Sequence, residues 1–187
     1  MANQSRKGIF PLNHVEGQDF LIPVDSSNGT NMFIGDVVKF VANGAVNPAA
    51  AGDANIVAGT VVELLDSNKI PVGLWNSSVS TKYLPSSTAG YALVALALPG
   101  RVFIAQSDTV LTTAAIAAST DHVAGSGSTT TGQSGHTING ADLNTGGQVF
   151  IVGQVNDVTN DITAANAKWY VIFNEGMLMG TGKSTGV

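Results

Sequence analysis

Residues 90–108 read GYALVALALPGRVFIAQSD, an almost continuous apolar stretch that is interrupted by Pro99-Gly100. A helix that spans a membrane needs about 20 consecutive apolar residues, whereas Ala92 to Leu98 supplies seven before the Pro-Gly turn. Two short strands separated by a turn fit the pattern better, with alternate side chains directed into a core. The sequence therefore predicts a buried strand–turn–strand unit that does not enter a membrane.

Further short strands are expected on both sides of this unit. Asn28-Gly29 and Asn43-Gly44 indicate tight turns, because Asn and Gly tolerate the positive φ angles that such turns require. Gly59 indicates a bulge or a close approach of two backbones. Residues 109–120 are rich in alanine, and a short helix is expected there. The other strands are predicted at residues 20–24, 32–42, 56–65, 70–75, 148–156 and 168–174.

The predicted fold class is all-β, a small β-barrel or β-sandwich formed by a single domain over residues 20–175. An irregular N-terminal arm is expected at residues 1–19 and a flexible Gly/Ser/Thr-rich loop insertion at 124–147. Residues 176–187 are expected to form a flexible tail. The expected core residues come from the predicted strands and are Val38, Phe40, Val61, Leu96, Phe103, Val152, Trp169 and Val171.

Charge is sparse in this chain. Charged residues make up 11% of the sequence, against about 25% in average soluble domains. Sparse charge weakens repulsion between copies and so favours close packing in an assembly. Nucleic acid is not the expected partner, because such binding needs clustered basic groups, and the eight Lys and Arg residues are scattered in a chain of net charge −5. The sequence has no cysteine, so disulfides and thiolate metal ligands do not contribute.

No residue pattern predicts catalysis, a cofactor or a metal site. The segment GMLMGTGKSTGV at 176–187 lacks the spacing of a phosphate-binding loop. His14, His122 and His136 are not spaced as a pair of zinc ligands, and no G-x-S-x-G nucleophile elbow accompanies them. We expect these histidines in surface loops, and the oxygen-rich segment 157–161 is expected to cap turns rather than to bind calcium. The chain is predicted not to be an enzyme.

The aromatic residues allow two interpretations. Trp75, Trp169 and three tyrosines could line a face that binds sugars. Because Trp169 stands inside an apolar strand, packing in the core is the expectation for these rings. A carbohydrate-binding or adhesin-like β-sandwich is kept as an alternative function.

Three passages carry a resemblance to a known family. The first is Gly35–Phe40 followed by Ala58–Glu63, the second is Pro71–Gly73 leading to residues 92–98 and 100–106, and the third is Trp169–Glu175. In these glycine turns and valine-rich strands the chain resembles the small head-decoration, or cement, proteins of tailed bacteriophages. The resemblance spans residues 30–108 and 148–175, and the segment 124–147 is not part of it.

The resemblance implies a compact β-barrel or sandwich, often a trimer, that binds the outer face of an assembled capsid. Its partner would be the major capsid protein, and its location would be the surface of the virion after synthesis in the host cytoplasm. Another structural subunit of the virion, from the tail or the baseplate, is a further alternative.

The N-terminal arm is a candidate for capsid contact. Arg6 and Lys7 supply charge, and Ile9 and Phe10 supply apolar anchors. Such a segment can lie across a neighbouring subunit and become ordered on binding. The alternative is a terminus that engages nothing.

Overall fold

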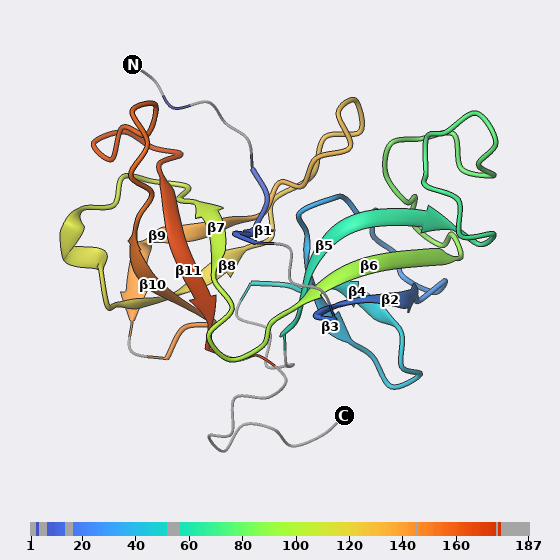
Figure 1. Ribbon diagram of the computed structural model, residues 1–187, viewed down its shortest axis with the longest axis horizontal. Coiled ribbons are helices and arrows are strands. Elements are labelled where there is room, and N and C mark those ends of the chain that lie inside the picture. Colours follow the sequence, from blue (N-terminus) through green and yellow to red (C-terminus); the bar gives the residue numbers. More distant parts are fainter. Residues whose placement is uncertain are drawn as a thin grey trace.

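The computed structural model describes residues 3, 7–13, 17–51, 57–144, 146–174 and 176 (Figure 1). This part of the chain is all-β, which confirms the predicted fold class. None of its helical segments is long and apolar enough to cross a membrane. The elements in chain order are β1 (Phe10–Pro11), β2 (Asp19–Val24), β3 (Val37–Phe40), β4 (Val46–Pro48), β5 (Val57–Asp66), β6 (Gly90–Leu96), β7 (Phe103–Gln106), the 3-10 turn η1 (Thr113–Ala115), β8 (Ser119–Val123), β9 (Thr137–Asn144), β10 (Val149–Gln154) and β11 (Lys168–Phe173).

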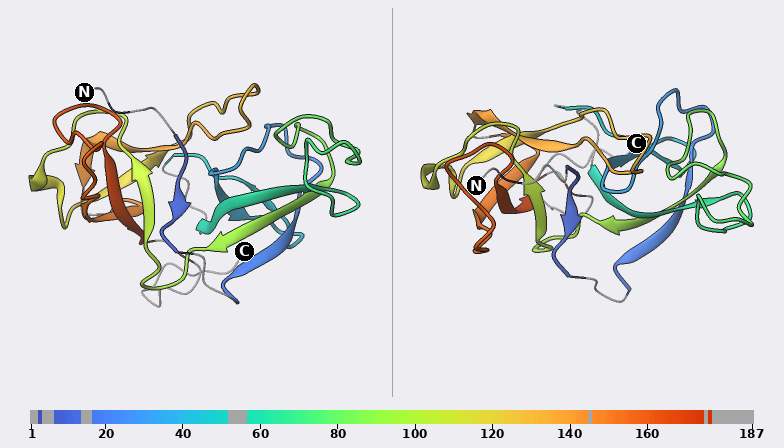
Figure 2. Two further views of the ribbon diagram at one scale, coloured as in Figure 1. Left: turned by 45° about the horizontal axis from the view of Figure 1, so that its top comes forward. Right: turned by 90° about the horizontal axis from the view of Figure 1, so that it is seen from above.

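Five strands close into a barrel in the order β2-β4-β3-β5-β6. β6 completes the closure, because it pairs antiparallel with β2 on one side and with β5 on the other. The remaining six strands form a second sheet in the order β1-β7-β11-β10-β8-β9. Figures 1 and 2 show this sheet beside the barrel along the longest axis of the molecule.

The stretch 90–108 joins the two sheets. β6 belongs to the barrel and β7 to the second sheet, so the turn at Pro99-Gly100 is a crossing between sheets and not the loop of a hairpin. β6 also contributes to both cores. Ala92, Val94 and Leu96 lie in the barrel core, whereas Ala95 packs in the core of the second sheet, as does Ala97 directly after the strand. The two strands were predicted correctly, and their pairing partners were not apparent from the sequence.

Seven of the eight expected core residues lie in one of the two cores. Val38, Val61 and Leu96 are buried in the barrel, and Phe40 is half-buried against them. Phe103, Trp169 and Val171 are buried in the second core. The prediction for Val152 was wrong, because this residue is exposed on β10. The pairing with β11 passes from Ile151 directly to Gly153, so Val152 is the extra residue of a β-bulge and points away from the core.

Gly59 lies both at a β-bulge and at a close approach of two backbones, the two possibilities predicted from the sequence. Its strand β5 has a bulge against β3, where the pairing passes from Val38–Gly59 to Lys39–Val57. A Cβ atom on Gly59 would overlap the backbone carbonyl of Ala95 on the neighbouring strand β6. The glycine therefore permits a close approach of the β5 and β6 backbones.

Three segments differ from the sequence prediction. Residues 109–120 form only the 3-10 turn η1 before β8 begins at Ser119, since Thr and Val disfavour a helix. Residues 70–75 form turns, with a single bridge between Pro71 and Leu65. The expected loop 124–147 contains β9, whose one fully buried large apolar side chain is Ile138. A strand at the end of a sheet needs few apolar residues, which is why composition concealed it.

Candidate functional site

The expected N-terminal arm is partly built into the fold. The backbone N–H of Gly8 donates to the carbonyl of His136 at 2.8 Å, and that of Ile9 donates to Gly35 at 2.9 Å. Ile9 is completely buried and Phe10 is half-buried, whereas Lys7 is exposed. The prediction that Ile9 anchors a free arm on a neighbour was wrong, because its side chain lies in the core of the second sheet. Arg6 lies outside the described residues, as do His14 and the tail residues 177–187.

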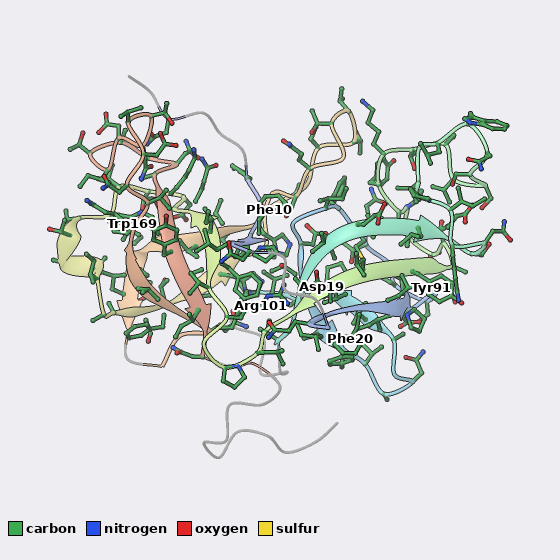
Figure 3. All side chains as sticks on the ribbon, viewed as in Figure 1. Phe10, Asp19, Phe20, Tyr91, Arg101 and Trp169 are labelled. Carbon is green, nitrogen blue, oxygen red and sulfur yellow. The ribbon has the colours of Figure 1, made fainter. Side chains whose placement is uncertain are left out.

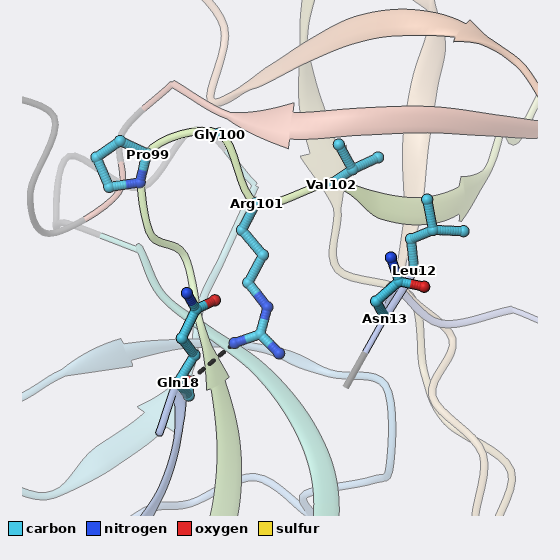
Figure 4. A pocket seen from close by; sticks show the side chains of 7 residues that line it. All are labelled: Leu12, Asn13, Gln18, Pro99, Gly100, Arg101 and Val102. Atoms are coloured by element: carbon cyan, nitrogen blue, oxygen red, sulfur yellow. Dashed lines mark hydrogen bonds between the residues drawn. The ribbon is translucent and has the colours of Figure 1, made fainter. Parts of the chain in front are cut away.

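A pocket of about 260 Å³ lies where the barrel meets the second sheet (Figure 4). Its walls come from the segment after β1, the start of β2 and the crossing between β6 and β7. The lining residues are Leu12, Asn13, Gln18, Pro99, Gly100, Arg101 and Val102.

Arg101 is the charged group of this pocket, and it is already paired. Its Nη1 donates to the carbonyl of Gln18 at 2.8 Å, and its Nη2 donates to the carboxylate of Asp19 at 2.7 Å. Both side chains of this ion pair are buried. Figure 3 places Arg101 and Asp19 between the two sheets. Since the carboxylate balances the guanidinium, the pair links the crossing segment to β2 and does not offer an unpaired positive charge to an anion.

His122 and His136 form a second cluster at the same junction. Both rings are buried, and they stack with centroids 5.3 Å apart. The prediction that these histidines lie in surface loops was therefore wrong. His122 contacts the side chain of Gln148 through Nδ1 at 2.7 Å and the carbonyl of Ala49 through Nε2 at 3.2 Å. These contacts tie β8 to the chain that follows β4 of the barrel.

His136 faces Asp36. The backbone N–H of Val37 donates to Nδ1 of His136 at 3.1 Å, so the neutral ring carries its proton on Nε2. That Nε2 lies 3.6 Å from Oδ1 of Asp36, and the other carboxylate oxygen accepts the N–H of Phe33 at 2.8 Å. Each hydrogen-bonding atom of the imidazole therefore has a neighbour in the protein.

Burial controls the protonation of this pair. Desolvation raises the pKa of Asp36 to about 7, although hydrogen bonds from Ser134 and Phe33 lower it. Desolvation and the neighbouring His122 lower the pKa of His136 to about 3. The two groups are shut away from solvent and lie 3.6 Å apart, and each is hydrogen-bonded to backbone N–H groups of residues 33–37, which suits a structural connection between the two sheets. Within the described residues, no three His, Asp or Glu side chains gather as a metal site.

Trp75 is the most exposed aromatic residue of the described chain, at 96%. The expectation of core packing was right for Trp169, which is completely buried, and wrong for Trp75. Trp75 lies in the loop between β5 and β6, and residues 67–83 are named here the Trp75 loop. The loop extends from the barrel at the end of the molecule opposite the second sheet (Figures 1 and 2).

One buried carboxylate holds the base of the Trp75 loop. Oδ1 of Asp66 accepts the N–H groups of Asn68 and Ile70, each at 2.9 Å. Oδ2 accepts the N–H of Ser78 at 2.7 Å and its hydroxyl at 2.8 Å, together with the hydroxyl of Ser77 at 3.2 Å. These hydrogen bonds hold the pKa of Asp66 well below its usual range. The loop that presents Trp75 is thus organised before any partner arrives.

The sequence analysis predicted neither the hydrogen bonds of Asp66 nor the Asp36–His136 pair, and the reasons differ. Asp66-Ser67-Asn68 has the composition of a turn in which the aspartate accepts from a backbone N–H two residues on, and this signal was available. Asp36 and His136 are separated by 100 residues along the chain, and nothing in either local sequence indicates the other.

No family model, curated protein or solved structure matches this chain. The description of this protein therefore rests on its own fold and sites. It is an all-β protein of two joined sheets with a paired, buried polar junction and an organised loop that exposes a tryptophan.

Proposed function

We propose that this protein is a virion structural protein that decorates the outer surface of a bacteriophage capsid. It binds major capsid subunits, acts as a homotrimer and has no catalytic activity. The location follows from the same proposal: the chain is made in the host cytoplasm and ends on the outside of the shell.

The observation that supports the proposal most is where the resembling passages lie. Gly35–Phe40 contains β3 and Ala58–Glu63 lies within β5, while residues 92–98 include most of β6 and residues 100–106 contain β7. Trp169–Phe173 falls within β11, against which β7 pairs. The resemblance thus covers a connected framework that includes three neighbouring barrel strands, β3, β5 and β6, and the crossing into the second sheet.

The architecture also suits a protein that braces a shell. A closed barrel has no free edge strand. Side chains of the barrel strand β6 pack in both cores, so a force on one sheet is transmitted to the other through packed side chains. Sparse charge permits close approach to neighbouring subunits, and the exposed Trp75 resembles the aromatic anchors that dominate protein interfaces.

Surface labelling of purified virus particles tests the proposed location. Particles from the source virus are treated with a lysine reagent that cannot enter the shell, and the peptides are then identified by mass spectrometry. We expect Lys69 or Lys82, which are exposed, to be labelled on intact heads, and gold-tagged antibodies to mark the heads. Absence of the protein from particles would contradict the proposal, and antibody on tails alone would assign the protein to the tail or baseplate.

A further inference from the structure

The chain contains the tripeptide Asn-Gly-Ala twice, at residues 43–45 and 139–141. An asparagine before a glycine is prone to deamidation, because glycine leaves the next backbone nitrogen free to approach the side-chain amide. In both copies Oδ1 of the asparagine accepts the N–H of the alanine two residues on, at 3.1 Å for Asn43 and at 3.0 Å for Asn139. The two sites therefore share their sequence and this local contact.

The two sites differ in the partner of the glycine N–H. The N–H of Gly44 donates to the backbone carbonyl of Val41 at 3.0 Å, in the turn before β4. The N–H of Gly140 donates instead to the carboxylate of Asp108 at 2.7 Å. A backbone carbonyl does not take up an amide proton at neutral pH, whereas a carboxylate at this distance lies within the reach that general-base catalysis requires.

The fold holds Asp108 against Gly140. The N–H of Asp108 donates to the carbonyl of Ile138 at 3.0 Å, beside the bridge that joins Ser107 to the same residue of β9. A Cβ atom on Gly140 would overlap Oγ1 of Thr109. Glycine at this position therefore lets the loop that carries the carboxylate lie directly on β9.

Gly140 stands outside the regular ladder between β8 and β9. Along β9 the pairing passes from Leu143 to Ile138 while β8 advances by only two residues. A bulge of this kind leaves backbone groups without a partner on the neighbouring strand, so the N–H of Gly140 is available to a side chain. Asn139 is half-buried and Asp108 is exposed, and water can therefore reach the site.

We propose that Asn139 is a site of deamidation that the fold accelerates, with Asp108 as the general base. The backbone nitrogen of Gly140 attacks the side-chain carbon Cγ of Asn139, and its proton passes to the Asp108 carboxylate. The attack uses the electron pair above the peptide plane, so the N–H stays directed at the carboxylate while the bond forms. The N–H of Ala141 stabilises the negative charge that develops on Oδ1.

The tetrahedral intermediate then loses ammonia. The bond from Cγ to the side-chain nitrogen breaks, and Asp108 returns the proton to that nitrogen, which regenerates the carboxylate and leaves a cyclic imide. Water adds to either carbonyl of the imide and opens the ring to aspartate or isoaspartate. Water is consumed and ammonia is released, without an oxidant or a cofactor. The change occurs once in each chain, so it is not the turnover of a substrate, and it adds a negative charge to older molecules.

Peptide mapping by mass spectrometry tests this inference on the folded, full-length chain after storage in neutral buffer. Asn139 is expected to convert at least about tenfold faster than Asn43, which is below the usual effect of a positioned base because a carboxylate is a weak base. Exposure alone predicts the opposite order, since Asn43 is exposed and Asn139 is half-buried. In guanidinium chloride that unfolds the chain, the two identical tripeptides should convert at equal rates.

Asp108→Asn keeps an oxygen that can accept from Gly140 but cannot take up its proton. Conversion of Asn139 in this variant should slow to about the rate of Asn43, and the rate of Asn43 should not change. Asp142→Asn is the matched control, because it removes an exposed carboxylate from the same strand and should leave both rates as in the wild type. Circular dichroism establishes that each variant is folded.

Two results would overturn the inference. One is a rate at Asn139 of the folded wild type that does not exceed the rate at Asn43. The other is an undiminished rate at Asn139 in Asp108→Asn. Because the chain itself is the only reactant besides water, both results are independent of whether the protein binds a capsid.

Discussion

At the scale of single residues, Gly59 and Gly153 both lie in strands, but they differ in the space available for a Cβ atom. A Cβ atom at Gly59 meets the Ala95 carbonyl and the backbone of Leu96, whereas nothing lies within 4 Å of a Cβ atom at Gly153. The barrel can accept a side chain at Gly59 only if β5 and β6 move apart.

Gly59→Ala is therefore expected to lower the free energy of unfolding by at least about 2 kcal/mol, in the range of substitutions that strain a packed backbone. Gly153→Ala is expected to change it by no more than about 0.5 kcal/mol. Urea denaturation of both variants measures the difference. Equal effects would show that the close approach of β5 and β6 does not constrain the barrel.

Asp36 and His136 have opposite effects on the pH dependence of stability. Folded Asp36 keeps its proton up to about pH 7, whereas its ordinary pKa is 3.8, so its contribution to stability is lost as the pH rises. Folded His136 stays neutral down to about pH 3, whereas its ordinary pKa is 6.5, so its contribution is lost as the pH falls. Between pH 3.8 and 6.5 both the folded and the unfolded pair hold one proton, and the two effects offset each other.

Asp36→Asn removes the titration of Asp36 and leaves that of His136. Relative to the wild type, its free energy of unfolding is expected to fall by about 1.4 kcal/mol for each unit that the pH is lowered below about 6.5, the slope for one proton. Urea denaturation at several pH values down to about 4.5 measures the two profiles. Asp142→Asn, at an exposed position, is the control. Parallel profiles for Asp36→Asn and the wild type would contradict the burial of this pair.

At the scale of elements, Asp66 organises the Trp75 loop. Its lowered pKa means that the folded carboxylate stays ionised in acid where the unfolded one takes up a proton. Its contribution to stability is therefore present above the ordinary pKa of 3.8 and is lost as the pH falls below that value.

Asp66→Ala removes all of the acceptors at the base of this loop. Amide hydrogen exchange at Asn68, Ile70 and Ser78 is expected to become faster by at least about tenfold, the factor that corresponds to about 1.4 kcal/mol of local opening. Exchange in β11, which belongs to the other sheet, should change much less. Unchanged protection of these three amides would show that other contacts hold the loop.

The sequence was informative where elements have local signals. Alternating apolar residues identified β2, β5, β6, β10 and β11, and Gly59 identified a bulge. β9 was missed because its residues are mostly polar and only Ile138 is a large, fully buried apolar side chain. Val152 was misplaced because a bulge reverses the alternation from which its burial was inferred.

The sites were less predictable than the strands. Trp75 was expected in the core together with Trp169, which stands inside an apolar strand, but Trp75 lies in the loop held by Asp66 and is exposed. The stacking of His122 on His136 depends on the arrangement of two sheets. A local pattern cannot report such long-range contacts, because the residues that make them carry no shared motif.

At the scale of the whole molecule, the two sheets should unfold together. Side chains of the barrel strand β6 lie in both cores, and the core of the second sheet includes Val37, Val57 and Ala95 from the barrel. In the variant Trp75→Phe, Trp169 is the single tryptophan and reports the second core. Its fluorescence and the far-ultraviolet circular dichroism of the whole chain should show the same midpoint in urea. Two separated midpoints would show that barrel and sheet are independent units.

The most direct test of the proposed function is calorimetry of empty capsids from the source virus, with and without the purified protein. If the chain is a decoration protein, it binds the shells to a fixed stoichiometry and raises the temperature at which they come apart. The protein should not raise this temperature for capsids of an unrelated phage. Source capsids that bind none of the protein and come apart at an unchanged temperature would contradict the account.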